Sequence, residues 1–598
     1  MTSIPTRNEV ATNDTWDLSA LFESEAAWNE AFDHLAAAES RLSAYQGRLG
    51  ESADTFFAFL EDYYRTDRDG SRLGHYAMLR QSEDAGDSAN QERFGRVVQL
   101  DAKLRAATSF FVPQLQQLDP QLVESYLTDP RAQDYRVALS KLLRYREHTL
   151  SPSEERLLAL QTEAEQTARR SFGALIDVDL DYGQIDTPEG QRPLSQSSLG
   201  SLLEHSDRTV RSTTFHQFYG HIEAHKNTLA SLYAGSVASD IYRARVRKFG
   251  SAREAALFPD NVPAEVYDNL VRTVREHLPV LHRYYALRKR HLGLSDYSVF
   301  DGRVSLVENS RKIRPYDSAV DTVVSAVAPL GAEYAQTLGD GLRGRWVDRY
   351  ENKGKRSGAF SAGGYDGPPY ILMNYQEDSL NHVFTLAHEA GHSMHSWYSV
   401  RSNPYPHYDY TIFEAEVAST VNEQLLVDHL LQTDTDPTTR AAVINHHIDD
   451  ILATLFRQTM FAEFEDQVHR HVESGGVASL DWLADSYAEL LSAYFGDQVA
   501  IPDVLRFEGL RIPHFYRAFY VYKYATGVSA SIALAQHILS DRPGARDNYL
   551  AFLKSGGSRF PIESLRVAGV DMTSPEPIEA AIALFDRRVT ELGELLES

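Results

Sequence analysis

The chain has 598 residues, a formal charge of 59 − 84 = −25 and no cysteine. The negative charge disfavours nucleic acid and anionic membranes as partners, and the lack of cysteine excludes disulfides and thiolate chemistry. Hydrophobic residues make up 43% of the chain, as in ordinary soluble proteins of several domains. Residues 1–14 are polar, and no run approaches the ~18 apolar residues of a membrane span. We therefore expect a cytoplasmic protein.

The first 170 residues read as a series of amphipathic helices. Their apolar periodicity predicts helices near 24–47, 52–82, 90–117, 133–147 and 153–170. Residues 176–181 alternate between apolar and acidic side chains, which predicts a strand, and a turn follows at 187–190. A serine-rich stretch at 195–201 then separates this region from renewed helical patterning. We place a boundary at 190–205 and predict two domains, 1–200 and 201–598.

The second part is again mainly helical, with apolar periodicity near 207–247, 263–292, 317–338, 437–474 and 479–496. A glycine- and proline-rich loop runs from 363 into a short apolar strand at 370–374. One interpretation is an exposed strand edge, carrying Tyr370 and Leu372, that pairs with an extended peptide while Gly363 and Gly364 let the loop flex. The other is a turn followed by a core strand. The sequence leaves both open.

The most specific motif is His388-Glu389-Ala390-Gly391-His392, which fits the H-E-x-x-H pattern of zinc peptidases. Two histidines four residues apart lie on one face of a helix, so both imidazoles can reach one metal ion. Glu389 then flanks the metal and can accept a proton from a metal-bound water. The motif therefore predicts a zinc site with a glutamate general base.

A catalytic zinc ion needs a third protein ligand, and the next predicted helix, around 411–425, offers one. Glu416 and Glu423 lie seven residues apart on one face of that helix, whereas Glu414 lies on another side. We predict Glu416 as the third ligand and Glu423 as the carboxylate that holds a ligand histidine. His395 shares a face with His392 and is either a further contact or, more in keeping with its surroundings, a supporting residue.

A third block, residues 512–527, contains His514 and the tyrosines Tyr516, Tyr520 and Tyr524 at intervals of four. If the block is helical, these tyrosines share one face. Their hydroxyls could stabilise the oxyanion of peptide hydrolysis, or they could form an aromatic core stripe. A helix that starts one residue later would bring Tyr522 into the same position. The candidates for substrate or oxyanion contact are therefore His514, Tyr516, Tyr520, Tyr522 and Tyr524.

These blocks, together with residues 15–22, resemble the M3 metallopeptidases, specifically the oligoendopeptidase F branch. The resemblance covers nearly the whole chain. It implies a mostly helical, deeply clefted fold that admits short peptides. It also implies zinc on His388, His392 and Glu416, Glu389 as general base, and His514 with tyrosines of the third block acting on the transition state. In this picture residues 1–200 form one wall of the cleft and residues 201–598 carry the catalytic site.

The sequence thus predicts an endopeptidase that holds one zinc ion per chain and hydrolyses internal bonds of short unstructured oligopeptides. Two alternatives remain. One is a peptidyl-dipeptidase, which needs a cationic group to hold a terminal carboxylate. The other is a peptide-binding scaffold that has lost catalysis, against which the intact Glu389 and ligand set argue. Oligomeric state and side-chain preference are not predicted.

Overall fold

The computed structural model describes residues 4–307 and 312–597, which form two compact units. Unit 1 contains residues 1–149, 311–429 and 534–570, and unit 2 contains residues 150–310, 430–533 and 571–598. The chain therefore passes several times between the two units. The predicted division into residues 1–200 and 201–598 has its boundary inside unit 2, and as a division of function it stays a prediction.

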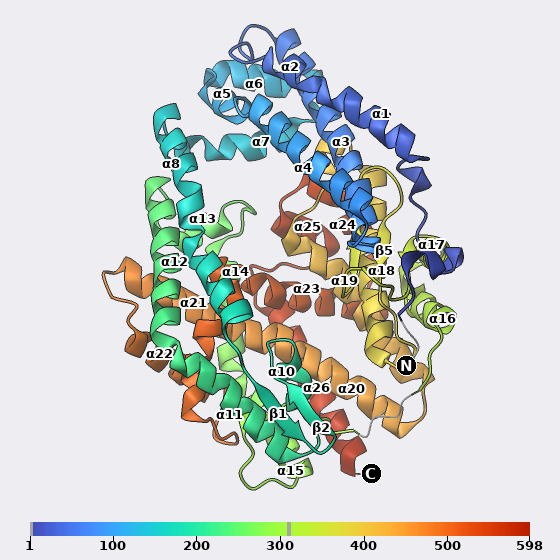
Figure 1. The fold of residues 1–598 in the computed structure, drawn as a ribbon, viewed down its shortest axis with the longest axis vertical. Helices are drawn as coiled ribbons and strands as arrows, with labels where there is room; N and C mark the ends of the chain where they lie inside the picture. The colour runs from blue at the N-terminus through green and yellow to red at the C-terminus, as the bar shows by residue number, and fades with distance from the viewer. Residues whose placement is uncertain (1–3, 308–311, 598) are drawn as a thin grey trace. The chain divides into compact units, whose positions relative to one another are not determined.

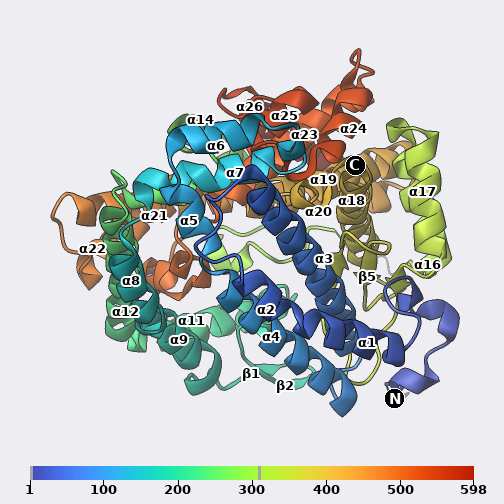
Figure 2. The same ribbon diagram turned by 90° about the horizontal axis from the view of Figure 1, so that it is seen from above.

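Unit 1 is built mainly from helices (Figure 1). The long helices α3 and α4 lie side by side, and α3 begins where the Ser52 hydroxyl accepts a hydrogen bond from the Thr55 N–H. The helices of this unit are α1 (Glu25–Ala36), α2 (Ala38–Ser43), α3 (Ala53–Glu83), α4 (Ser88–Thr108), α5 (Phe111–Gln117), α6 (Pro120–Thr128), α7 (Arg136–Leu143), α16 (Tyr316–Ala326), α17 (Ala332–Arg343), α18 (Leu380–Ser402), α24 (Ala545–Ser555) and α25 (Pro561–Ala568). Helix α19 (Ile412–Thr433) lies in this unit for most of its length. Figure 2 shows α16 and α17 side by side next to α18.

Unit 2 is also helical. Its helices are α8 (Pro152–Glu165), α9 (Thr167–Gly173), α10 (Ser198–Leu203), α11 (Arg208–Ala224), α12 (Lys226–Val246), α13 (Ala252–Leu257), α14 (Ala264–Glu276), α15 (Leu278–His291), α20 (Pro437–Ile451), α21 (Arg457–Glu473), α22 (Leu480–Phe495) and α26 (Glu576–Glu597). Helix α23 (Tyr522–Leu539) begins in unit 2 and ends in unit 1. The mostly helical fold class is confirmed. Within the described ranges, no helix combines the length and apolar character that a membrane crossing requires.

The strand predicted at 176–181 is wrong. Residues Ala174–Asp179 form a π-helical turn that continues α9. The strands lie just beyond it, where β1 (Gln184–Thr187) and β2 (Gly190–Pro193) form an antiparallel hairpin around the predicted turn. Alternation of apolar and acidic residues over six positions does not distinguish a strand from the end of a helix, and here the preceding helix continued.

Unit 1 also contains a three-stranded sheet in the order β3-β5-β4, formed by Val347–Asp348, Tyr370–Leu372 and Phe360–Ala362. The central strand β5 pairs with β3 on one side and β4 on the other, and Tyr370 and Leu372 are fully buried in the core. The exposed-edge interpretation of this strand is therefore wrong, because both of its edges are already paired. The two edge strands are β3 and β4, and β4 packs against α18.

Candidate active site

The candidate site is built on α18 and α19, which approach each other unusually closely at Gly391. A Cβ atom at this position would lie 2.5 Å from the Ser419 Cα and 2.7 Å from the Ala418 carbonyl oxygen. Only glycine allows this backbone contact. The glycine inside the motif therefore brings the two helices together, so that side chains of α19 reach the histidines of α18.

The side chains of His388, His392 and Glu416 converge as the sequence predicted. One ligand atom from each lies within 4.8 Å of the others. The two Nε2 atoms are 3.2 Å apart, and the Glu416 Oε2 lies 3.4 Å from the His388 Nε2 and 3.7 Å from the His392 Nε2. Among the described residues this is the group of His, Asp and Glu side chains that has the geometry of a metal site.

Glu389 is the buried carboxylate next to this cluster, with 7% of its surface exposed. Burial raises the pKa of its carboxyl to about 7; the charge of His388 opposes this rise, and the carboxylate of Glu416 adds to it. The Ser361 backbone N–H, on strand β4, faces the Glu389 carboxylate and acts to lower its pKa. A carboxyl group with a pKa near neutrality can both accept and return a proton.

Glu423 holds the first histidine in place. Its Oε1 lies 3.0 Å from the His388 Nδ1, on the ring nitrogen that faces away from Glu416. A carboxylate there favours the proton on Nδ1 and leaves the Nε2 lone pair free for a metal. From the neighbouring position in the chain, the Asn422 amide donates a hydrogen bond to the Ala387 carbonyl, 3.3 Å away, and accepts one from the buried Tyr334 hydroxyl. These buried contacts join α17, α18 and α19.

Two other residues of these helices lie outside the cluster, Glu414 and the candidate His395. Glu414 is buried beside the start of α19, where its carboxylate accepts a hydrogen bond from the Thr411 N–H, and burial raises its pKa to about 7. His395 is 1% exposed and stacks on Tyr410 with ring centres 3.6 Å apart, and burial lowers its pKa to about 3. A buried, neutral ring on Tyr410 supports the helix packing, so of the two roles weighed for His395 the structure favours the supporting one.

A pocket of about 700 Å³ opens at the cluster, and we call it the active-site pocket. Its lining includes His392 and Glu416, the edge strand β4, and both Gly363 and Gly364. The two glycines are closely packed, since a Cβ atom would lie 2.1 Å from the Ser396 Oγ at Gly363 and 2.6 Å from the His75 Nδ1 at Gly364. They allow the backbone after β4 to lie directly against neighbouring side chains, and nothing in this packing requires a moving loop.

The third block belongs to unit 2 and is not a regular helix. Residues Pro513–Tyr516 form a 3-10 turn, Phe519 has a positive φ of 54°, and α23 begins only at Tyr522. The predicted helical face shared by Tyr516, Tyr520 and Tyr524 is therefore wrong. Even so, the His514, Tyr520 and Tyr524 rings gather within 5.3 to 6.2 Å of one another, and the Tyr524 and Tyr520 hydroxyls are 3.4 Å apart.

The other two tyrosines of this block point elsewhere. Tyr516 packs on Phe172 with ring centres 4.4 Å apart, and also lies 6.4 Å from the Tyr233 ring. Tyr522 is fully buried and packs against Tyr267 in the core of unit 2, 5.2 Å between ring centres. Tyr522 is thus closed to a substrate, and the prediction that it contacts one is wrong. The turn at Phe519 changes the direction of the chain between these tyrosines.

Comparison with known proteins identifies the family. The model of peptidase family M3 matches residues 201–584, and a model described as oligopeptidase F matches residues 114–182. The chain belongs to peptidase family M3. As a member of that family it is a metalloendopeptidase, in line with the cluster on α18 and α19.

Full-length relatives share the oligopeptidase F description. The chain is 41% identical over 595 residues to oligopeptidase PepF of Bacillus subtilis, an alignment that covers 99% of this chain and 89% of PepF. It is 38% identical to an oligoendopeptidase F homolog of Borreliella burgdorferi, with 99% and 100% covered. Among solved structures, oligoendopeptidase F from Enterococcus faecium superposes with a TM-score of 0.75 at 34% identity, covering 95% of this chain and 98% of that one.

Several residues of this M3 peptidase site have no clear signal in the sequence. Ser361 faces Glu389 and bonds the Ser393 hydroxyl at 2.8 Å, while His75 and Arg356 line the active-site pocket. These residues are distant from the motif in the chain, so only tertiary packing brings them to it. Gly391 is different, because a glycine in the middle of a predicted helix is itself a sign of close backbone approach.

Proposed function

We propose that this M3 peptidase is a zinc endopeptidase that hydrolyses internal bonds of short, unstructured oligopeptides. The observation that carries the proposal is the convergence of His388, His392 and Glu416 beside the buried Glu389. Two imidazoles and one carboxylate are the protein ligands of many catalytic zinc sites, which keep a fourth position open for water or substrate. The names of the oligoendopeptidase F relatives support the peptide substrates.

The three ligand atoms fit a zinc ion in their spacing. Ligands at 2.0–2.2 Å from a tetrahedral ion are about 3.3–3.6 Å from one another. The observed separations of 3.2, 3.4 and 3.7 Å bracket that range, which supports one zinc ion per chain. When bound, such an ion polarises the scissile carbonyl and lowers the pKa of a coordinated water.

The chain's own residues would supply the remaining chemistry. Glu389 accepts a proton from the attacking water on its carboxylate and delivers it to the leaving amine, which a pKa raised by burial favours. Glu423 keeps His388 in one tautomer and orientation. We also assign His514, Tyr520 and Tyr524 as donors to the oxyanion of the transition state, because three donor side chains gathered in one cluster suit that role.

We assign the binding of the peptide backbone to β4 in place of β5. Its residues Phe360–Ala362 are half-buried, line the active-site pocket and pair with a neighbour on one side only. An edge strand can pair with an extended peptide through main-chain hydrogen bonds that do not depend on side chains. Folded proteins cannot present such a strand, so short peptides would be cut and native proteins spared. The acidic composition without cysteine is in keeping with a cytoplasmic location and with no nucleic-acid or membrane partner.

Metal analysis combined with mass spectrometry of digested peptides tests the proposal. We expect one zinc ion per chain and internal cleavage of peptides that carry an acetylated amino terminus and an amidated carboxyl terminus. Release of C-terminal dipeptides alone, and only from peptides with a free carboxyl terminus, would establish a peptidyl-dipeptidase instead. A chain that holds zinc and binds peptides without cleaving any would be a scaffold.

A further inference from the structure

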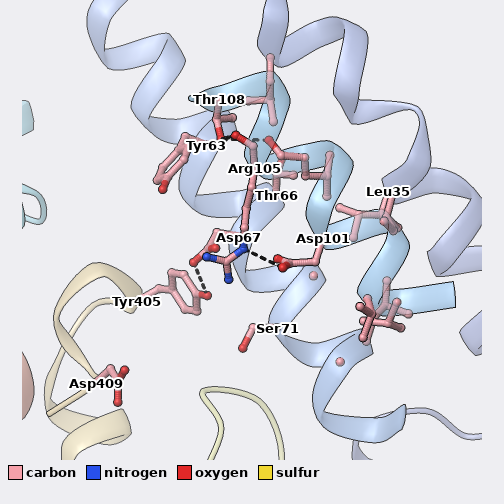
Figure 3. Close-up of a pocket in the computed structure, with 18 of the residues that line it drawn as sticks. Leu35, Tyr63, Thr66, Asp67, Ser71, Asp101, Arg105, Thr108, Tyr405 and Asp409 are labelled. Atoms are coloured by element: carbon pink, nitrogen blue, oxygen red, sulfur yellow. Dashed lines mark hydrogen bonds and ion pairs between the residues drawn. The ribbon is translucent and has the colours of Figure 1, made fainter. Parts of the chain in front are cut away.

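The active-site pocket adjoins a second cavity. This cavity, of about 490 Å³, lies between α3 and α4 and the loop at 405–409, and we call it the α3–α4 cavity (Figure 3). The two spaces share four lining residues, Ser71, Gly74, Tyr408 and Asp409. Both belong entirely to unit 1. The two spaces therefore adjoin, and we describe them together as one groove that starts beside His392 and Glu416.

Helix α3 sets the order of residues along this groove. From its C-terminal end, Ser82 contacts the Arg356 backbone, His75 and Gly74 line the active-site pocket, and Asp67 lines the α3–α4 cavity. Ser82 and Asp67 are 15 residues apart, which at 1.5 Å per residue is about 22 Å. An extended peptide of about seven residues covers the same length at roughly 3.3 Å per residue.

Arg356 lies at one end of the groove, where backbone hydrogen bonds fix its main chain and its guanidinium lies near an aromatic ring. Its backbone N–H donates to the Ser82 carbonyl at 2.9 Å, its carbonyl accepts from the Asn374 amide at 3.0 Å, and its guanidinium lies 5.3 Å from the centre of the Phe360 ring. The side chain is exposed and lines the active-site pocket. Within the described residues it makes no ion pair, so its two donor edges are available to a carboxylate.

The opposite end of the groove carries the opposite charge. The α3–α4 cavity is lined by the carboxylates of Asp67 and Asp101 against the single guanidinium of Arg105, and Asp409 adds a carboxylate where the two spaces meet. Figure 3 shows Arg105 turned toward Asp101, with 2.6 Å between the bonded atoms, and Tyr405 bonded to Asp67 at 2.8 Å. A peptide carboxylate is repelled at this end and attracted by Arg356 at the other.

We propose that Arg356 anchors a substrate carboxylate on the C-terminal side of the scissile bond, while the amino-terminal residues of the peptide extend into the α3–α4 cavity. The inference rests on the proposed function of the same site. It fixes the direction of the peptide as antiparallel to β4. Along α3, Arg356 before the strand contacts Ser82, Gly364 after the strand lies against His75, and the cavity follows at Asp67. Such polarity favours peptides with a free carboxyl terminus or an acidic residue there, while amidated peptides still bind through main-chain pairing and are cleaved internally.

Binding measured without turnover tests the proposal. In a zinc-loaded Glu389→Gln background, a fluorescent heptapeptide with a free carboxyl terminus is compared by anisotropy with its C-terminal amide. We expect the acid to bind about 10-fold more tightly, the usual scale of one charge-assisted hydrogen-bonded pair. An amide with glutamate as its last residue distinguishes the two sources of the carboxylate: tight binding assigns the anchor to the side chain, and weak binding assigns it to the terminus.

Arg356→Gln should then bind the acid and both amides with equal affinity. Arg401→Gln is the matched control, because Arg401 is also exposed and lies on an aromatic ring, that of Trp397, but outside the groove. It should keep the full preference. Asp67→Asn should lower the affinity for peptides with a free amino terminus more than the affinity for acetylated peptides.

Equal affinity for the acid and both amides in the parent, or an unchanged preference in Arg356→Gln, would overturn the proposal. The proposal would also be overturned if the loss of affinity in Asp67→Asn depended on whether the carboxyl terminus of the peptide is free, and not on its amino terminus. Failure of the proposed endopeptidase function itself would be seen in different measurements, namely the metal content and the cleavage products of the wild-type chain.

Discussion

The helix pair α18–α19 and the aromatic block at 512–527 were both predicted from regular spacing, and only the first prediction of a shared helical face is correct. His388 and His392 lie on one continuous helix, so their four-residue interval translates directly into convergent ring nitrogens. The tyrosines of the block have the same interval, but a positive φ at Phe519 interrupts the helix. Spacing therefore locates a site only where the backbone stays regular between its members.

The largest effect expected from this comparison is on the metal site itself. Glu416→Ala should lose zinc and with it almost all activity, because one of three ligands is gone. Glu414→Ala should keep the metal and lose stability, because Glu414 is buried against Thr411 at the start of α19. Metal analysis and thermal melts of both variants provide the check. Zinc retained in Glu416→Ala and lost in Glu414→Ala would identify Glu414 as the ligand instead of Glu416.

Glu389→Gln should separate metal binding from catalysis. All three ligands remain, so zinc content should be unchanged, whereas loss of the proton acceptor should lower kcat by roughly 10²–10⁴-fold. Steady-state kinetics on a zinc-loaded preparation measure this. Turnover close to that of the wild type would exclude the general-base role.

The aromatic block should respond through kcat. Tyr524→Phe removes one hydroxyl and leaves the ring, and we expect kcat to fall by roughly 10²–10³ with little change in KM. Tyr520→Phe should behave similarly but more weakly. Tyr516→Phe is the control, since its ring packs on Phe172 outside the cluster, and it should keep kcat. Full kcat in both Tyr520→Phe and Tyr524→Phe would leave the block as core packing only.

Glu423→Ala should have an intermediate effect. The His388 ring would lose the carboxylate on its Nδ1, so its orientation and basicity would change while all three ligands stay. Losses of this kind are typically ~10–100-fold in metal affinity or activity. Zinc titration with a competing chelator compares the variant with the wild type, and an unchanged affinity together with unchanged activity would remove Glu423 from the site.

The last effect is graded, concerns pH, and is small close to neutrality. Glu389 must be ionised to accept a proton, and burial raises the pKa of its carboxyl to about 7. Activity should therefore fall as pH decreases through the folded pKa, by about tenfold per unit well below it. A bound cation favours the ionised form, so the acid limb of kcat/KM should lie at or below about 7. A pH profile that is flat from 7 to 4 would contradict this assignment.

The strands show where pattern reasoning reached its limit. The apolar run at 370–374 was predicted as a strand, and its first three residues form β5, but its exposure depended on which strands paired with it. Strand β3 comes from residues 347–348 and β4 from 360–362, and both are too short to be recognised alone. Because β5 occupies the centre, the edge that lines the pocket is β4. Sheet order is a tertiary property that no local pattern contains.

The sequence by itself determined the convergence of His388 and His392, the position of Glu389 beside them and the helical fold class, because these depend on the fixed geometry and apolar periodicity of single helices. Tertiary structure alone decided the rest. Gly391 lets α19 approach α18 closely enough for Glu416 and Glu423 to reach the histidines. Packing of α3 against the loop around β4 brings His75 and Arg356 to the same pocket from distant parts of the chain. Which residues become neighbours in this way depends on the apolar surface that entire helices and strands bury together. The contribution of each single residue is too small to be recognised in the sequence.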